Sequence, residues 1–406
     1  MTRKKLSLAV APFQVRSFRF QWPADLLTSW AFEMETLILA WYVLVETNSI
    51  FWLTLFGSLQ FLGTLVAPIF GLLGDRLGRR KVLCSMRAAY SLIAAIIMTL
   101  AFAGSLSVYY VFLLAFCSGM IRPSDLVMRN ALIGDTMRAN RLANALSISR
   151  TTMDSARIAG ALSGAGLFSQ LGLGNAYLVV VAIYLASFTL TLAVAGSRGT
   201  HSLLDAQPSP WEDLKQGLKY VWETPVMRAI MSLAFLVNFT AYPIFLGLLP
   251  YIARKIYQVD ESGLSYLVAA FASGALIGSL VMIIGGRWRK PNKIMIYGIA
   301  AWHLLILVFA SSGSFSSGLF ILVLAGMTQS MAMIAMSVML IELTEPAYRG
   351  RVMGLRILAV YGLPLGLFVS SPLIANIGFS AMAYLYGLAG LALSTAIVII
   401  YRHKIW

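Results

Sequence analysis

The sequence predicts an all-α integral membrane protein with twelve transmembrane helices in two six-helix bundles. Of the 406 residues, 59% are hydrophobic and only 12% are charged, which is about half the charged fraction of a soluble protein. The apolar residues also gather in runs of about 20, the length at which a helix crosses a bilayer. Together these features exclude a cytosolic enzyme, a disordered regulator and a DNA-binding module.

Twelve apolar runs reach this length and are separated by polar or basic intervals. The predicted spans are residues 24–46, 51–73, 83–103, 107–130, 142–169, 175–196, 228–252, 263–285, 294–311, 317–341, 352–375 and 379–401. The longest polar interval, 197–227, contains Pro208 and Pro210 followed by mixed apolar and charged residues at 211–222, which predicts a helix lying flat at the cytoplasmic interface. The chain is therefore predicted to begin with a cytoplasmic tail (1–23) and a six-helix bundle (24–196). The linker with the interfacial helix (197–227) follows, and then a second six-helix bundle (228–401) and a second cytoplasmic tail (402–406).

The net charge of +15 is explained by topology. Successive loops between the predicted spans lie on alternate sides of the membrane. Almost all Lys and Arg residues of these loops fall on one side, and the other side has Arg254 and Lys255. The positive-inside rule then places both termini in the cytoplasm and predicts a multi-pass protein of the cell (plasma or inner) membrane. No separate domain carries a basic face, so no nucleic-acid partner is predicted. Cys84 and Cys117 lack metal-binding spacing, and neither a metal site nor a cofactor is expected.

The two halves show a faint repeat. The segment 135–143, after the fourth span, has a counterpart at 345–353, after the tenth, and the basic loop 75–81 has one at 286–290. Two related six-helix halves are a transporter architecture, with the substrate site near the membrane midplane.

The loop after the second span reads GLLGDRLGRRK at residues 71–81. It resembles the signature loop G-x-L-x-D-R-x-G-R-[RK]-[RK] of the major facilitator superfamily, and the resemblance covers the whole chain. Further segments, at 41–49, 157–164, 218–225 and 349–352, resemble the branch that contains the enterobactin exporter and related drug:proton antiporters. This resemblance implies the major facilitator fold and secondary transport.

The resemblance also implies a gating role for this loop, whose expected residues are Gly71, Asp75, Arg76, Gly78, Arg79 and Arg80. The two glycines allow close helix approach and a tight turn. In the family the equivalent of Asp75 is thought to latch the second and third helices to the eleventh, which here begins near Val352. For Arg79, Arg80 and Lys81 a plain topological role is the alternative.

Two family motifs are incomplete. The antiporter pattern G-P-x-x-G-G on helix five is represented only by residues 160–164, GALSG, without its proline. The Arg-before-Gly motif on helix four is absent, since Gly119 precedes Arg122. Both departures weaken the inference of proton antiport.

Seven charged residues fall well inside the predicted spans, where exposure to lipid costs about 3 kcal/mol each. They are Glu33, Glu35, Arg122, Asp125, Asp154, Arg157 and Arg356. The pairs 122/125 and 154/157 are three residues apart, so each can meet on one helix face. These pairs either neutralise themselves or offer Asp125 and Asp154 for proton coupling, with Arg122 and Arg157 as charge partners.

Glu33 and Glu35 have no basic residue on their own helix within pairing distance. They lie about 200° apart around the axis, so we expect one to meet Arg122 or Arg157 and the other to be unpaired or to face water. Either is a proton-coupling candidate. Glu33 is favoured because it shares a face with Ser29 and Thr36, whereas Asp25 is expected to be an acid at the helix start.

The carboxy-terminal half offers mostly uncharged candidates for the substrate cavity: Asn238, Tyr242, Gln329, Arg356 and Tyr361. His303 is expected to be a buried, hydrogen-bonded scaffold residue. For the methionines at 327–339 ordinary packing is favoured over an adaptable binding wall.

The leading hypothesis is therefore proton-coupled efflux of an amphipathic small molecule, drug-like or siderophore-like, by alternating access, and the protein is expected to be a monomer. An uptake permease or uniporter for a small metabolite is the alternative. An integral membrane enzyme and a membrane receptor are distant ones, because only one His lies in the spans and no GxSxG or HExxH motif occurs. The loop at 71–81 lacks the GK[ST] ending of a P-loop, which excludes ATP-driven transport by this chain alone.

Overall fold

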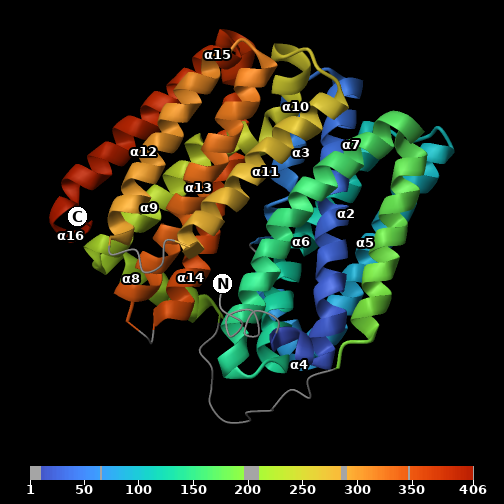
Figure 1. The fold of residues 1–406 in the computed structure, drawn as a ribbon, viewed down its shortest axis with the longest axis horizontal. Helices are drawn as coiled ribbons and strands as arrows, with labels where there is room; N and C mark the ends of the chain where they lie inside the picture. The colour runs from blue at the N-terminus through green and yellow to red at the C-terminus, as the bar shows by residue number, and fades with distance from the viewer. Residues whose placement is uncertain (1–10, 65, 196–209, 285–289, 346–347, 406) are drawn as a thin grey trace. The chain divides into compact units, whose positions relative to one another are not determined.

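The computed structural model describes residues 11–64, 66–195, 210–284, 290–345 and 348–405. These residues form helices joined by short turns (Figure 1). The chain divides into two compact units. Unit 1 comprises Met1–Glu46 with Leu59–Asp205, and unit 2 comprises Thr47–Ser58 with Ala206–Trp406.

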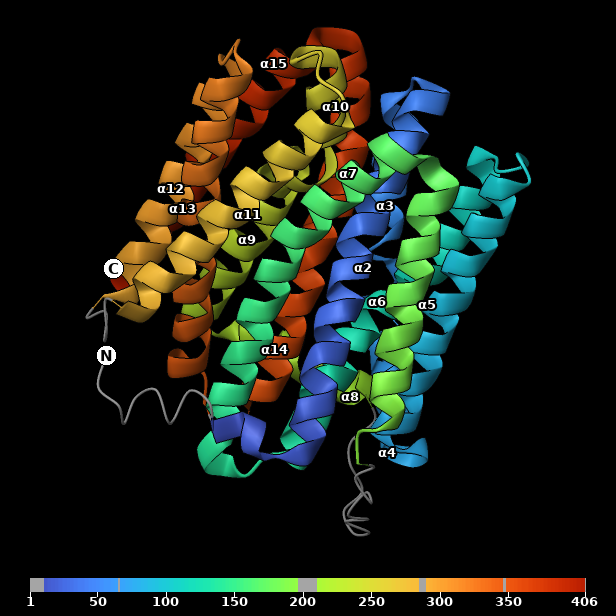
Figure 2. The same cartoon turned by 45° about the vertical axis from the view of Figure 1, so that its right-hand side comes forward.

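Unit 1 is built around α2 (Arg16–Thr47), which runs beside α5 (Arg79–Phe102), α6 (Val108–Thr136) and α7 (Ala139–Leu192) in both views (Figures 1 and 2). A single turn, η1 (Ala11–Gln14), precedes α2. The short η2 (Leu62–Thr64) and α4 (Ala67–Leu77) lead into α5.

Glycine positions explain two features of unit 1. Gly172 has φ 75°, a left-handed conformation that favours glycine, and it divides α7 into two helices. This break separates the predicted fifth and sixth spans. The predicted second span is also interrupted, by η2, because a β-carbon at Gly63 would lie 2.3 Å from the Met120 carbonyl oxygen and one at Gly119 would lie 2.1 Å from that of Leu59. The backbones therefore cross in direct contact at these two glycines.

Unit 2 begins at Thr47, the last residue of α2, and includes the short turn that follows it. Its helices are α3 (Ile50–Leu59), of which Leu59 belongs to unit 1, then α8 (Pro210–Glu223), α9 (Pro225–Thr240), η3 (Pro243–Gly247), α10 (Leu249–Tyr251), η4 (Ile252–Ile256), α11 (Glu261–Ile284), α12 (Pro291–Ala310), α13 (Phe315–Leu343), α14 (Arg349–Leu358), η6 (Ala359–Tyr361), α15 (Gly362–Ile400) and α16 (Arg402–Ile405).

Several crossings are composite. Gly378, with φ 81°, divides α15 into two helices, which matches the predicted eleventh and twelfth spans. The seventh crossing is α9 continued through π-helical turns at Pro243–Gly247 and Ile252–Ile256. The eleventh begins as α14 and passes through η6. Counted in this way, the described residues give the twelve-helix, all-α membrane fold that the sequence predicts.

By length and apolarity alone, seven helices in the described ranges can cross a membrane, or eight if the pair 215–223 and 225–240 is one span. That pair is bent by 109°, so α8 runs across the direction of α9. A helix that exposes Leu218 and Trp222 while running across a span fits the flat interfacial helix expected at 211–222. The division of the chain into tails, bundles and linker remains a prediction.

Candidate functional site in unit 1

The central helix α2 carries three acidic residues well within its length, Asp25, Glu33 and Glu35, and a fourth, Glu46, near its end. Asp25 and Glu35 are buried, with 4% and 8% of their surface exposed, whereas the Glu33 side chain is 19% exposed. Since positions 33 and 35 are about 200° apart on a helix, the two glutamates face different neighbours. Of these three carboxylates on α2, one is therefore partly open and two are closed.

Glu33 lies between two arginines, and we call Glu33, Arg122 and Arg157 the Glu33 group. The Glu33 Oε1 is 3.4 Å from Arg157 Nε and 3.8 Å from Arg122 Nη2. The two arginine side chains are 25% and 32% exposed. The structure thus brings together three of the predicted charged residues, from α2, α6 and α7.

Neutral oxygens hold Arg122 more closely than Glu33 does. Its Nη1 donates to Gln60 Oε1 at 2.5 Å and to Thr36 Oγ1 at 3.1 Å. Its guanidinium also lies 4.7 Å from the centre of the Phe32 ring, a favourable cation–π position. Arg122 is therefore fixed in direction while a quarter of its side chain stays exposed.

Glu35 is enclosed by aromatic residues. Its Oε2 accepts a hydrogen bond of 2.9 Å from the Tyr184 hydroxyl. Tyr184 stacks on Tyr90, with ring centres 5.7 Å apart, and both rings contact Phe32 edge-on. A phenol can hydrogen-bond a carboxyl group in either protonation state, so these contacts persist when Glu35 gains or loses a proton.

A second set of charges, which we call the buried charge cluster, consists of Asp25, Arg87, Asp125 and Arg129. Arg129 Nε lies 2.5 Å from Asp125 Oδ2 and 3.8 Å from Asp25 Oδ1, and Arg87 forms an ion pair with Asp25. No side chain in the cluster is more than 5% exposed. Two cations and two anions balance, which is what burial of charge requires.

Polar side chains around this cluster tie α2, α5, α6 and α7 together. Arg129 Nη1 donates to Ser29 Oγ at 2.8 Å, and Gln21 Nε2 donates to the Arg129 carbonyl at 3.0 Å. Arg87 donates to Thr191 Oγ1 from the second part of α7. The cluster therefore joins one end of four helices.

The expectations for Asp125 and Asp25 were wrong. Asp125 pairs with Arg129 and Arg87 rather than with Arg122, because helical side chains lean toward the helix amino terminus, so Arg129 leans back onto Asp125 while Arg122 leans away from it. Asp25 is not at a helix start, because α2 begins at Arg16 and places Asp25 in its third turn.

Asp154 lies apart from these two sets. Its Oδ2 is 3.6 Å from Arg150 Nε, one turn earlier on α7, and the Arg150 side chain is 69% exposed. Arg157 reaches across to Glu33. Asp154 and Arg157 therefore do not form the expected pair with each other: Asp154 pairs with Arg150 on its own helix, and Arg157 pairs with Glu33 on α2.

The segment 160–164 places α7 directly on α2. A β-carbon at Gly160 would lie 2.6 Å from the Glu33 Cβ and 2.9 Å from the Trp30 carbonyl oxygen, and one at Gly164 would lie 3.0 Å from the Met34 Cα. The glycines of this segment therefore allow the close approach that brings Arg157 to Glu33, although the proline of the family motif is absent.

We expect Gly160→Ala to move α7 away from α2 and to lower the transport rate severalfold, because the added methyl group has no space beside Glu33. Overpacking of this kind costs about 1–3 kcal/mol. Gly166→Ala is the matched control, since nothing lies within 4 Å of a β-carbon at Gly166 on the same helix. Transport rate and thermal unfolding of both variants test this, and equal behaviour of the two would contradict the close approach.

In the predicted gating loop, Gly78 has φ 93° and joins α4 to α5. Arg79 Nη1 forms an ion pair with Asp135 Oδ1 at 2.5 Å and approaches the Ala131 carbonyl at 3.3 Å. Arg80 donates to the Leu192 carbonyl, and Arg76 is exposed. The surroundings of Gly71 and the side chain of Asp75 lie outside what the structure describes, so the latch remains a prediction.

Among the candidates in unit 2, the structure joins Tyr242 and Gln329, whose Nε2 donates to the Tyr242 hydroxyl at 2.7 Å. Arg356 donates to Ser337 Oγ at 2.5 Å and to the Met333 carbonyl at 3.3 Å. Asn238 donates to the Ala234 carbonyl of its own helix, and Tyr361 ends η6.

His303 is fully buried, 2.8 Å from Thr240 Oγ1 through Nε2 and 2.9 Å from the Ile299 carbonyl through Nδ1. This is the hydrogen-bonded scaffold state predicted for it. Of the methionines at 327–339, Met336 and Met339 are buried, whereas Met327, Met331 and Met333 are half-buried.

Sequence reasoning missed Arg87, Arg129, Gln60 and Tyr184. The two arginines carried a usable signal, because both fall inside predicted spans, at 83–103 and 107–130, where an unpaired charge is costly. Tyr184 and Gln60 carried none, because a tyrosine or glutamine in an apolar run is informative only once its neighbours are known.

A twelve-helix membrane fold whose interior holds paired and partly open charges defines a polytopic transporter. The Major Facilitator Superfamily model matches residues 26–355, so the chain belongs to this superfamily. It is accordingly a multi-pass membrane protein and a secondary transporter of a small-molecule substrate, and not an enzyme.

Individual proteins similar to this chain agree with that assignment. Macrolide efflux protein A from Streptococcus pyogenes is 23% identical over 381 residues, which is 90% of this chain and 93% of that protein. Multidrug efflux pump Tap from Mycolicibacterium fortuitum is 25% identical over 377 residues, covering 89% and 90%. The crystal structure of the nucleoside transporter NupG has a TM-score of 0.75 at 14% identity, covering 96% of this chain and all of that one, and it shares the fold.

Proposed function

We propose that the protein exports an amphipathic small molecule, drug-like or siderophore-like, in exchange for protons by alternating access. Two relatives that match about nine-tenths of the chain are efflux proteins. The observation that carries the proposal is the pair of carboxylates on α2, one enclosed by phenols and the other shared by two guanidinium groups.

Within this proposal Glu35 is the proton-binding group. Its hydrogen-bond partner, Tyr184, is neutral and serves the carboxyl group in both protonation states. Protonation of Glu33 would instead remove the carboxylate that Arg122 and Arg157 share, so we assign Glu33 to positioning these cations. Asp125 is neutralised inside the buried charge cluster and Asp154 lies beside Arg150, and we rank both below Glu35.

Exchange requires that substrate and proton exclude each other. A cationic or strongly hydrogen-bonding group of the substrate placed near Glu35 favours the ionised carboxylate and therefore proton release. Protonation then weakens substrate binding by the same factor, because coupling between two ligands is reciprocal. This sign of coupling is what drives export by an inward proton gradient.

The remaining candidates take supporting roles in the proposal. Residues 71–81, with Gly71, Asp75, Arg76, Gly78, Arg79 and Arg80, form the gate. Tyr242, Gln329, Asn238, Tyr361 and Arg356 supply the substrate contacts of unit 2. We place both termini in the cytoplasm of a monomer in the plasma membrane.

A second candidate, proton-linked uptake of a small anionic metabolite, is favoured by Arg122. Its guanidinium is partly exposed, and its closest partners are the neutral oxygens of Gln60 and Thr36, so a substrate carboxylate can compete for it. Protonation of a nearby glutamate would strengthen binding of such an anion. Proton and substrate would then move in the same direction, which is the opposite sign of coupling.

Everted membrane vesicles containing the protein separate these functions. With an acidified lumen, exchange predicts accumulation of the cationic dye ethidium or of erythromycin in the lumen, abolished when nigericin collapses the pH gradient. Proton-linked uptake predicts instead that carboxyfluorescein, an anion, leaves an acidified lumen faster than it leaves the lumen of vesicles without a pH gradient. Transport of any of these probes at a rate independent of the gradient would contradict proton coupling altogether.

A further inference from the structure

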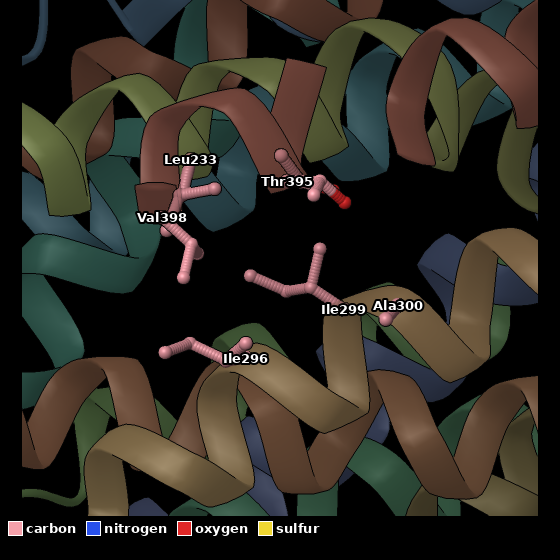
Figure 3. Close-up of a pocket in the computed structure, with 7 residues that line it drawn as sticks. Leu233, Ile296, Ile299, Ala300, Thr395 and Val398 are labelled. Atoms are coloured by element: carbon pink, nitrogen blue, oxygen red, sulfur yellow. The ribbon is translucent and has the colours of Figure 1, made fainter. Parts of the chain in front are cut away.

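Three helices of unit 2 line a partly open apolar cavity of about 100 Å³. Figure 3 shows Leu233 of α9 and Val398 of α15 on one side, facing Ile296 and Ile299 of α12 on the other. Ala300, Ser394 and Thr395 complete the lining. An apolar cavity of roughly 150 Å³ accepts benzene, so this one has room for a short stretch of hydrocarbon.

The cavity lies close to one end of all three helices. Leu233 is eight residues after the start of α9 at Pro225, Ile296 is five after the start of α12 at Pro291, and Val398 is two before the end of α15 at Ile400. At 1.5 Å per residue, every lining residue lies within about 14 Å of a helix end. That is less than half of the roughly 30 Å hydrocarbon thickness of a bilayer, so the cavity is confined to one leaflet.

Arg228 stands one and a half turns before Leu233, toward that helix end. Its guanidinium carbon lies 5.8 Å from the centre of the Trp222 ring and 5.9 Å from that of Tyr401. Tyr401 is three residues after Val398, so the two aromatic rings approach Arg228 from α8 and from the end of α15. They hold the guanidinium between the apolar cavity and the helix ends.

Within the described ranges, the structure gives Arg228 no carboxylate at ion-pair distance. Its Nε is buried and has no hydrogen-bond partner. Lys219, on the neighbouring α8, differs in that it is 3.9 Å from Glu223 and 74% exposed. A partly buried guanidinium that has no carboxylate partner favours an anion with oxygen acceptors at its exposed part.

The surroundings are those of a membrane surface. Trp222 is 69% exposed and Ile399 and Ile400 are 60% and 72% exposed. Exposed aliphatic residues on one side and an aromatic residue beside cations on the other are typical of the boundary between acyl chains and headgroups. The positive-inside rule makes this the cytoplasmic boundary.

We infer that Arg228, Trp222 and Tyr401, together with the cavity between α9, α12 and α15, bind one anionic phospholipid of the cytoplasmic leaflet. The guanidinium takes the phosphate, and one acyl chain enters the cavity beside Leu233 and Val398. The site lies within unit 2 and stands independently of the direction of transport and of the coupling ion.

Native mass spectrometry on the full-length protein, released from micelles containing equal amounts of phosphatidylglycerol and phosphatidylcholine with identical chains, tests this site. The wild type is expected to retain one phosphatidylglycerol in preference. Arg228→Gln should lower that preference about tenfold, and Arg228→Lys should keep most of it. Lys219→Gln, which removes a cation on the same surface, is the matched control and should leave it unchanged.

Two further measurements test whether the anion bound at Arg228 is a lipid headgroup or free phosphate. Ala300→Phe, which fills the cavity, should reduce retention of both lipids while leaving the cation in place. Inorganic phosphate at millimolar concentration should not displace the lipid. An unchanged lipid ratio in Arg228→Gln, equal effects of Arg228→Gln and Lys219→Gln, or displacement by phosphate would each overturn the inference.

Discussion

Arg129→Gln is expected to destabilise the protein by about 3–5 kcal/mol, the cost of leaving a buried carboxylate without its partner. Arg129 lies 2.5 Å from Asp125 and 3.8 Å from Asp25, and its side chain is 2% exposed. Its loss leaves two aspartates with Arg87 alone. We expect a sharply reduced yield of folded protein and a lower midpoint of thermal unfolding in detergent.

The double variant Asp125→Asn with Arg129→Gln removes one charge of each sign and should recover most of the lost stability. Arg150→Gln is the control, because Arg150 also pairs with an aspartate one turn away but is 69% exposed, and surface ion pairs contribute about 0–1 kcal/mol. If Arg129→Gln were no more destabilising than Arg150→Gln, the buried charge cluster would not stabilise unit 1.

Glu35→Gln is expected to abolish transport driven by a pH gradient while leaving the protein folded. Glutamine keeps a hydrogen bond to Tyr184 but cannot release a proton, so the coupling between proton and substrate is lost. Substrate should still equilibrate across the membrane, at a rate that no longer responds to an imposed gradient. Uptake of ethidium into acid-loaded vesicles, with and without nigericin, measures this directly.

Glu46→Gln is the matched control, because Glu46 is exposed near the end of the same helix. Glu33→Gln should behave differently from Glu35→Gln. It removes the carboxylate that Arg122 and Arg157 share, so we expect weaker substrate binding with the response to the pH gradient retained. Gradient-driven accumulation that persists in Glu35→Gln would exclude Glu35 as the proton-binding group.

Much of the fold followed from local sequence signals. Apolar runs of about 20 residues located the crossings, and the predicted boundaries around Gly172 and Gly378 correspond to the breaks within α7 and α15. The interruption of the second span at η2 was not predictable, because it depends on the contact of Gly63 with Met120 across two helices. The π-helical turns after Pro243 and Pro250 likewise depend on tertiary packing.

The candidate site was predictable in part for the same reason. The cost of charge in hydrocarbon singled out Glu33, Arg122 and Arg157, and the structure places them together. Helical spacing could not decide whether Asp125 pairs with Arg122 or Arg129, since both lie within one turn of it. The enclosure of Glu35 by Tyr184 and Tyr90 arises from three separate helices and has no sequence pattern.

The central claim is that a proton leaves Glu35 when substrate binds. Proton release can be measured with a pH indicator when ethidium or erythromycin is added to the purified protein in weakly buffered detergent solution. The wild type is expected to release protons when substrate binds at neutral pH, and Glu35→Gln to release none while still binding. Equal proton release by the wild type and Glu35→Gln, or proton uptake on binding, would contradict the claim.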